Sequence, residues 1–164
     1  MGMEIKRNSW VQFCKKFNAS NQLRPATVSI AHKGEDAVGT HENTPFMGLT
    51  LTKKGRLIDG IELFAGSFDP DHLVKPIATV KEPSRIVLEK RTDGTDDRLV
   101  IEGKDGTVAS VALTDTNVPD QRQAFVEKVA YSMYERRGHT HGNDVNDWLE
   151  AERRVTETEL QFVK

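Results

Sequence analysis

The sequence contains a single cysteine among its 164 residues. One thiol cannot form a disulfide within the chain or a zinc centre of several thiolates, and this pattern indicates a reducing compartment. No apolar run approaches the roughly 20 residues that a membrane-spanning helix needs, and the first residues have the pattern of neither a signal peptide nor a myristoylation site. We therefore expect a cytoplasmic protein that does not act in a membrane.

The sequence also lacks a concentrated basic region. Its net charge is −2, and its longest basic clusters are pairs: Lys15-Lys16, Lys53-Lys54, Arg136-Arg137 and Arg153-Arg154. Binding to nucleic acid draws its free energy from counterion release, which needs a concentrated basic face. We expect no nucleic-acid partner.

Motifs that carry catalysis are missing as well. The glycines form neither a phosphate-binding loop nor a G-x-G-x-x-G turn, and no serine stands in a G-x-S-x-G setting. We therefore assign no catalytic residue and no cofactor. The chain is nevertheless long enough to bury a sizeable core, with 37% hydrophobic residues.

The first periodic segment predicts a helix over residues 9–19. Ser9 and Gln12 have the spacing of a capping box, in which each side chain accepts from or donates to the backbone of the first turn. One apolar stripe follows at helical spacing, formed by Trp10, Phe13, Cys14 and Phe17. Because Cys14 shares this stripe, we interpret it as a small buried hydrophobic residue and not as a nucleophile.

The middle of the chain alternates between apolar and polar residues, as strands do. We expect about six strands, within residues 25–31, 49–52, 57–64, 84–90, 99–102 and 107–113. A polar connection spans residues 32–45, and turns are expected at Lys53-Lys54-Gly55, at Asp69-Pro70-Asp71 and at two Asp-Gly pairs. Short connections make neighbouring strands antiparallel, so the fold class is α+β with an antiparallel sheet or partly open barrel.

The last part predicts two helices joined by a short loop, an αα-hairpin. Asp120 with Gln123 would cap the first helix, and Gly138 would end it. The second helix would begin near Asn143 or Asp144. Apolar residues form one stripe on each predicted helix: Val126, Val129, Ala130, Met133 and Tyr134 on the first, and Val145, Trp148, Leu149 and Val155 on the second.

Fixed spacings within this hairpin carry a family resemblance. The run contains Ala130-Tyr131, then Tyr134-Glu135-Arg136-Arg137-Gly138, Gly142, Asp147-Trp148-Leu149 and Ala151-Glu152. It resembles the small bacterial helical-hairpin family known as domain of unknown function twenty-nine thirty-four. The rest of the chain is similar to the bacterial family known as domain of unknown function fifty-three thirty-five, through Trp10, Phe13 and Phe17, through His72-Leu73 with Ile77, and through Gly106-Thr107. Neither resemblance implies catalytic residues, and both imply a bacterial protein.

Two clusters have the composition of metal ligands. His139, His141 and Asp144 come closest to a transition-metal set, but alternate residues of a loop diverge, and a third ligand is not secured. We expect no metal there and interpret Asp144 as a favourable charge in the first turn of a helix. The segment from Asp93 to Asp97 resembles the start of a calcium loop. Arg98 and Lys104 occupy the positions where that loop needs Gly and Glu, so a solvated turn is expected.

The aromatic and basic residues of the hairpin are the candidate interaction residues, because such side chains are typical of binding hot spots. They are Tyr131, Tyr134, Arg136, Arg137 and Trp148. An internal clasp between the helices is the interpretation that we favour for Trp148, and Tyr131 is left undecided. Arg136 and Arg137 would also suit a helix C-terminus, where the dipole favours cations.

We divide the chain into a helix-plus-sheet domain over 1–117 and the helical hairpin over 118–164. The hairpin is too small to fold alone, so it should bury Val129, Met133, Trp148 and Leu149 against the sheet, a second copy, or both. The expected function is a non-enzymatic binding or assembly module that forms a homodimer or contacts another protein. The alternative is a small enzyme or ligand-binding protein that uses the polar loops around His32, His41 and His72.

Overall fold

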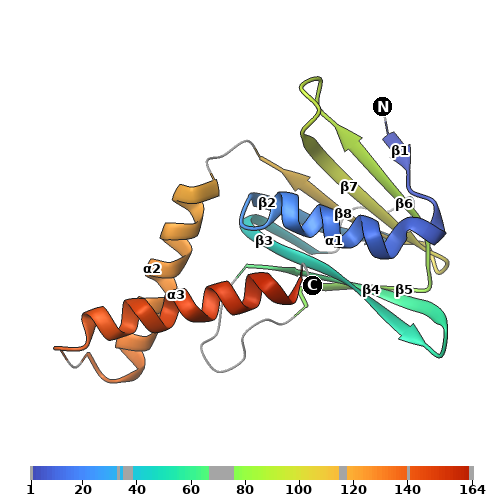
Figure 1. Cartoon of the computed structure of the whole chain (residues 1–164). Coiled ribbons are helices and arrows are strands. Elements are labelled where there is room, and N and C mark those ends of the chain that lie inside the picture. Colours follow the sequence, from blue (N-terminus) through green and yellow to red (C-terminus); the bar gives the residue numbers. More distant parts are fainter. Residues whose placement is uncertain are drawn as a thin grey trace.

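A computed structural model describes residues 2–32, 34, 39–66, 76–114, 118–139 and 141–162. It shows an α+β fold, with one helix packed on an antiparallel sheet and a pair of helices that projects from it (Figure 1). The helices are α1 (Trp10–Asn21), α2 (Val118–Arg136) and α3 (Asp144–Gln161), and the 3-10 turn η1 (Arg7–Ser9) precedes α1. None of these helices, over the residues described, is long and apolar enough to cross a membrane.

The sheet is open, and its strands lie in the order β1-β6-β7-β8-β2-β3-β4-β5. The strands are β1 (Gly2–Glu4), β2 (Pro25–His32), β3 (Gly39–Lys54), β4 (Leu57–Ala65), β5 (Ala78–Lys81), β6 (Pro83–Lys90), β7 (Asp96–Gly103) and β8 (Thr107–Leu113). All neighbouring strands are antiparallel. The predicted fold class is therefore confirmed, although the sheet has eight strands instead of about six.

The prediction of a polar connection over residues 32–45 is wrong at its two ends. His32 is the last residue of β2, and β3 already begins at Gly39, where its polar stretch pairs with β2. Polar residues are tolerated there because this part of β3 is exposed on both faces: the successive residues Thr40, His41 and Glu42 are all exposed. The expected turn at Asp69-Pro70-Asp71 lies outside the described residues.

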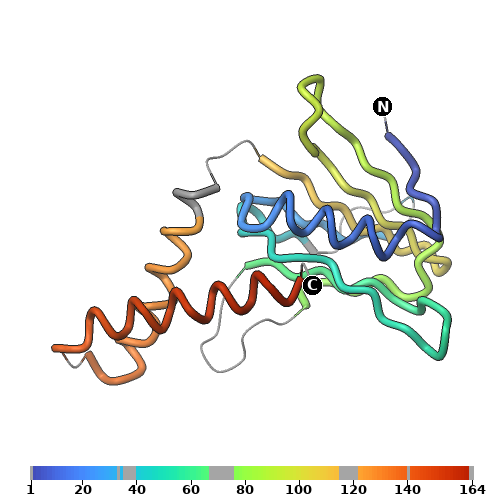
Figure 2. Tube along the Cα trace, viewed as in Figure 1, coloured from blue at the N-terminus to red at the C-terminus, as the bar shows by residue number. Residues whose placement is uncertain are grey.

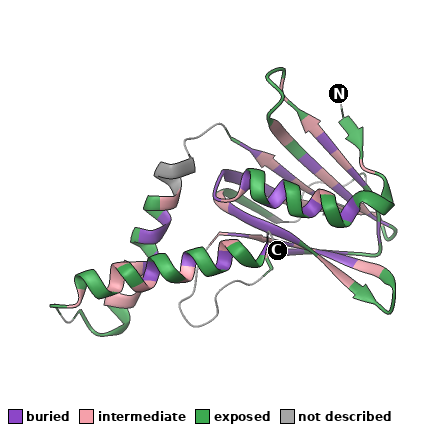
Figure 3. Ribbon diagram, in the orientation of Figure 1, coloured by how far each residue is buried: buried purple, intermediate pink, exposed green. Residues whose placement is uncertain are grey.

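The first core lies between α1 and the sheet. Trp10, Cys14 and Phe17 are buried in it, Phe13 is packed at its margin, and Phe17 meets the ring of Phe46 edge-on at 5.3 Å. Figure 3 shows the buried stripe along α1 facing the sheet, with exposed residues on the opposite side. The predicted apolar stripe is therefore confirmed.

The start of this helix differs from the prediction. The turn η1 precedes α1, so that Ser9 itself has a helical backbone conformation and its side chain makes no capping hydrogen bond. Its hydroxyl lies 3.4 Å from Oδ1 of Asn8. The chain is instead anchored by Trp10, whose indole N–H donates to the Ile5 carbonyl at 3.0 Å, with the guanidinium of Arg7 over its ring.

Cys14 is expected to react slowly with thiol reagents in the folded protein. Burial raises the pKa of its thiol to about 12, so the reactive thiolate is scarce at neutral pH. Labelling with a chromogenic disulfide should be at least a hundredfold faster in denaturant than in buffer. In buffer, only the small fraction of molecules in which the region around Cys14 has opened can react. Equal labelling rates in the two conditions would contradict the buried position.

A second core joins the helical pair to the sheet. Its buried residues are Leu23, Met47, Phe125, Val126, Val129, Ala151, Val155 and Phe162, with Phe64, Ala130, Met133 and Trp148 at its margin. Strand β3 contributes to both cores because a different core covers each of its two faces. A β-bulge interrupts its pairing with β4 between Phe46 and Gly48, so that Phe46 and Leu49, three residues apart, lie on the same face. Phe46 and Leu49 then face the first core, and Met47 faces the second.

The C-terminal end of α3 returns to the sheet beside α1 (Figure 2). The ring of Phe162 lies directly over Gly48, where an added Cβ would come within 2.4 Å of it. Two side-chain amides at the end of α1 bind the same end of α3: Asn18 in the helix donates to the Phe162 carbonyl at 2.8 Å, and Gln22, the residue that follows the helix, donates to the Glu159 carbonyl at 2.8 Å. These side chains donate to carbonyls at the end of α3, where a helix leaves acceptors without a full set of intrahelical partners, and the Glu159 carbonyl also accepts from the Phe162 N–H at 3.3 Å.

Candidate interaction surface

The two C-terminal helices are fastened to each other at both ends. At the tip, Gly138 has a φ of 71°, the left-handed conformation that ends α2, and Arg137 then donates to the carboxylate of Asp147 on α3. At the other end, Arg122 of α2 donates to Glu159 at 3.0 Å and to Thr156 at 2.7 Å. The predicted stop at Gly138 and the start of α3 at Asp144 are both confirmed.

Four rings gather at the tip of the pair. The ring of Tyr134 lies 5.0 Å from that of His139, 5.6 Å from that of His141 and 6.1 Å from that of Tyr131. The hydroxyl of Tyr134 is 3.5 Å from Nε2 of His141. Tyr131 is the most exposed of the three aromatic candidates, with 57% of its surface accessible.

A shallow hollow of about 390 Å³, here called the tip pocket, opens beside these rings between α2 and α3. It is lined by Glu127, Ala130, Tyr131, Tyr134, His141, Asp144, Asp147 and Trp148. Three aromatic faces and three carboxylates therefore surround one space. Neither Glu127 nor Asp144 forms an ion pair with another described residue, whereas Asp147 is engaged by Arg137.

The predicted interaction residues have different positions. Trp148 is half-buried at the margin of the second core, which agrees with a clasp between the helices, and Arg137 is used for the contact with Asp147. Arg136 is exposed in the last turn of α2. Tyr131 and Tyr134 are the two that line the tip pocket from α2.

The weak metal-ligand candidates His139, His141 and Asp144 do not form a ligand set in the described part of the chain. Within the part of the chain that the structure describes, no group of three or more His, Cys, Asp or Glu residues is placed to hold a metal ion. His139 and His141 both pack against the ring of Tyr134. Asp144 begins α3, where its charge faces the positive end of the helix dipole. The hydroxyl and the backbone N–H of Thr95 both donate to the Asp93 carboxylate and lower its pKa.

The histidines of the alternative hypothesis are not brought together where they are described. His32 ends β2 opposite Thr107, whereas His41 lies on β3 opposite Val28. Because Val28 and His32 are four positions apart on β2, His41 lies about 13 Å from His32 along the strand direction. His72 lies outside the described residues.

The predicted apolar stripe of α3 is wrong in part. We expected Val145 and Leu149 to share a buried stripe with Trp148 and Val155, but 72% and 57% of their surfaces are exposed. The buried face of α3 instead uses Trp148, Ala151, Val155, Thr158 and Phe162. Their alternating spacing of three and four residues is visible in the sequence and would have separated the two faces.

Comparison with known families gives a match in this part of the chain. A family model described as "Protein of unknown function (DUF2934)" matches residues 121–157, which cover most of α2 and α3. An uncharacterised C-terminal domain therefore coincides with the helical pair and with the segment that carried the first resemblance. No curated protein and no solved structure matches the chain.

Proposed function

We propose that this protein is a non-enzymatic binding and assembly module that forms a homodimer through α3. The observation that carries the proposal is a line of exposed apolar side chains, Val145, Leu149 and Leu160, here called the outer stripe. Val145 and Leu149 lie one helical turn apart, and neighbouring exposed apolar residues mark interaction surfaces more often than single ones do. Leu160 lies about 16 Å further along α3. The helical pair also projects from the sheet, so the outer stripe is accessible (Figures 1 and 3).

The spacing of the outer stripe fits a helix-to-helix contact. Leu149 follows Val145 by four residues and precedes Leu160 by eleven, and both intervals return to nearly the same side of an α-helix. At 1.5 Å per residue the stripe extends for about 22 Å. It is separate from the buried face of α3, so a second copy could cover it without disturbing the second core.

A two-fold axis at the middle of the stripe gives a self-complementary register. We place two α3 helices, one from each copy, antiparallel, so that the numbers of residues lying opposite each other add up to 305. In this register Val145 of one copy lies opposite Leu160 of the other, and Leu149 lies opposite Thr156. The same register brings Glu152 opposite Arg153. The contact is then apolar at both ends and joins opposite charges at its centre, as an isologous interface requires.

The tip pocket supports a contact with a second protein. Aromatic faces attract cations through their quadrupole, and the free carboxylates of Glu127 and Asp144 add a negative charge. A Lys or Arg side chain of a partner protein would satisfy both features. Tyr131 and Tyr134 are the proposed contact residues on α2.

The setting of the protein belongs to the same proposal. A single cysteine, buried in the first core, suits a bacterial cytoplasm. On its sequence pattern, we also propose that the N-terminal part is related to the bacterial family known as domain of unknown function fifty-three thirty-five. The alternative of a small enzyme built on the histidine loops is less well supported, because His32 and His41 stand apart.

Light scattering tests the assembly proposal. We expect the full chain to have twice the mass of one copy, and the double substitution Val145→Glu, Leu149→Glu to yield a folded monomer. Both side chains are exposed within one copy, so the unfolding free energy of the monomer should change by less than about 0.5 kcal/mol. Leu57→Glu is the matched control, since Leu57 is 72% exposed on the hairpin of β3 and β4 and should leave the dimer intact. A monomeric wild-type chain at high concentration would refute the proposal.

A further inference from the structure

A cavity of about 340 Å³, here called the α1 pocket, lies between α1 and the strands β1 and β6. Phe13 and Phe17 form its apolar wall on the helix side, with ring centroids 5.6 Å apart. Leu88 and Met3 form the wall on the sheet side. They are register partners of neighbouring antiparallel strands, so their side chains point to the same face. The volume lies within the range of pockets that hold small molecules.

Two lysines line this cavity with the apolar wall. Lys16 stands on α1 one turn beyond Phe13, and Lys90 stands two positions beyond Leu88 on the same face of β6. Both are exposed, and neither forms an ion pair with any residue that the structure describes. The lining of the α1 pocket thus combines an apolar wall with two ammonium groups that have no ion-pair partner among the described residues.

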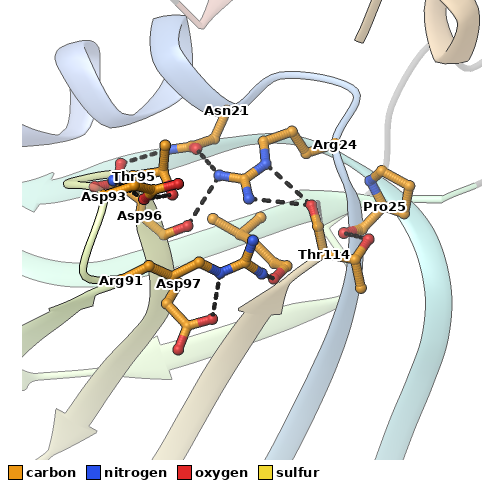
Figure 4. A network of polar contacts seen from close by, with 10 residues as sticks. Asn21, Arg24, Pro25, Arg91, Asp93, Thr95, Asp96, Asp97 and Thr114 are labelled. Atoms are coloured by element: carbon orange, nitrogen blue, oxygen red, sulfur yellow. Dashed lines mark hydrogen bonds and ion pairs between the residues drawn. The ribbon is translucent and has the colours of Figure 1, made fainter. Parts of the chain in front are cut away.

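A third cation, that of Arg24, also lines the cavity, and Figure 4 shows its polar contacts. Arg24 is only 8% exposed, and its guanidinium donates to Oδ1 of Asn21 at 2.8 Å and to the backbone carbonyls of Asp96 and Thr114 at 3.0 Å each. All these acceptors are neutral oxygens, so none of these bonds neutralises the charge of Arg24. Asp96 is the only carboxylate of the lining, and its Oδ2 accepts from Asn21 at 2.8 Å.

Hydrogen bonds hold the remaining edge of the α1 pocket. It is the turn between β6 and β7, in which the Arg91 N–H donates to the Thr95 carbonyl and the Gly94 N–H to that of Arg91. Asn21 and Arg24 hold Asp96 from the opposite side. These hydrogen bonds order this edge without a ligand, which lowers the entropy cost of binding.

We propose that the α1 pocket binds a small amphipathic anion. Its apolar body would lie against Phe13, Phe17 and Leu88, and its carboxylate or phosphate group would lie between Lys16 and Lys90. Three cations against one carboxylate give the cavity a positive potential, and an apolar wall alone would not select an anion. This site is separate from the helical pair, so it does not depend on the proposed assembly.

Calorimetric titration of the full chain tests the proposal with four probes below their micelle concentrations: decanoate, decyl phosphate, butyrate and decanol. We expect one saturable site for decanoate, decyl phosphate or both, with affinity at least tenfold weaker for butyrate, which lacks the apolar length, and for decanol, which lacks the charge. The combined substitution Lys16→Gln, Lys90→Gln should weaken binding of the anions at least tenfold, because charge-assisted contacts are lost. Added salt should weaken it as well.

Lys54→Gln serves as the control, because Lys54 is equally exposed but lies at the far turn of β3 and β4. It should leave the affinity unchanged. Amide shifts on binding should cluster at Phe13–Asn21 and at Leu88–Asp96. The proposal is overturned if neither anion binds saturably, if decanol binds as tightly as decanoate, if the lysine substitutions have no effect, or if the shifts lie elsewhere.

Discussion

Replacing Gly48 with alanine should detach the C-terminal end of α3 from the sheet. The new methyl group would come within 2.4 Å of the Phe162 ring, which lies over this glycine, and the ring is confined by Phe64 at 5.1 Å. Gly48 does not have a positive φ, so the backbone itself accepts alanine. Crowding in a packed core costs about 1 to 3 kcal/mol of unfolding free energy, measured by urea denaturation.

A double-mutant cycle separates this steric clash from other effects of the substitution. Phe162→Ala should by itself cost about 3 to 5 kcal/mol, because the buried ring leaves a cavity. With that ring removed, the added cost of Gly48→Ala should fall to nearly zero. If the two costs simply add, Phe162 does not rest on Gly48 in solution and the docking of α3 described above is wrong.

Asn18→Asp should be as damaging, although the two side chains have almost the same shape. The amide of Asn18 is buried, donates to the carbonyls of Leu49 and Phe162, and accepts from the Leu49 N–H. A carboxylate cannot donate to either carbonyl, and it would be buried among them. An unsatisfied buried group costs about 1 to 3 kcal/mol and a buried charge costs more, so a loss on the order of 3 kcal/mol is expected at pH 7.

This loss should depend on pH with a definite sign. Burial and the two carbonyls favour the protonated acid, so the folded-state pKa of the new carboxyl lies above the unfolded value of about 3.9. The deficit relative to wild type is then smallest below pH 3.9, grows as the pH rises, and levels off above the folded-state pKa. Urea denaturation of both proteins between pH 3.5 and pH 7.5 measures it. A deficit that stays constant over this range would show that the side chain at position 18 is solvated.

Much of the fold follows from local patterns in the sequence. The stripe of Trp10, Cys14 and Phe17 predicts the face of α1 that is buried, and Gly138 marks the end of α2. The two missing strands, β1 and β5, have only three and four residues, too few for an alternating pattern to stand out. They form because the edges of β6 and β4 offer them backbone partners.

The contacts that join the helical pair to the sheet could not be read from sequence. They depend on Asn18 of α1 and on Gln22, which follows α1. Asn18 binds Phe162, 144 positions further along the chain, and Gln22 binds Glu159, 137 positions further along. Neither amide differs in composition from an ordinary exposed helix residue. The α1 pocket could not be predicted from the sequence for the same reason, since Lys16 and Lys90 line one cavity only because α1 packs on the sheet.

Disulfide trapping tests the proposed assembly most directly. Within one chain, residues 149 and 156 are separated by seven residues of helix, or about 10.5 Å, which is too far for a disulfide. In the proposed antiparallel pair they lie opposite each other in the two copies, and the buried Cys14 should not interfere. The variant Leu149→Cys, Thr156→Cys should therefore form a covalent dimer under mild oxidation, whereas the out-of-register variant Leu149→Cys, Leu160→Cys should not. No covalent dimer from the first variant, or equal yields from the two, would contradict the assembly of this protein through α3.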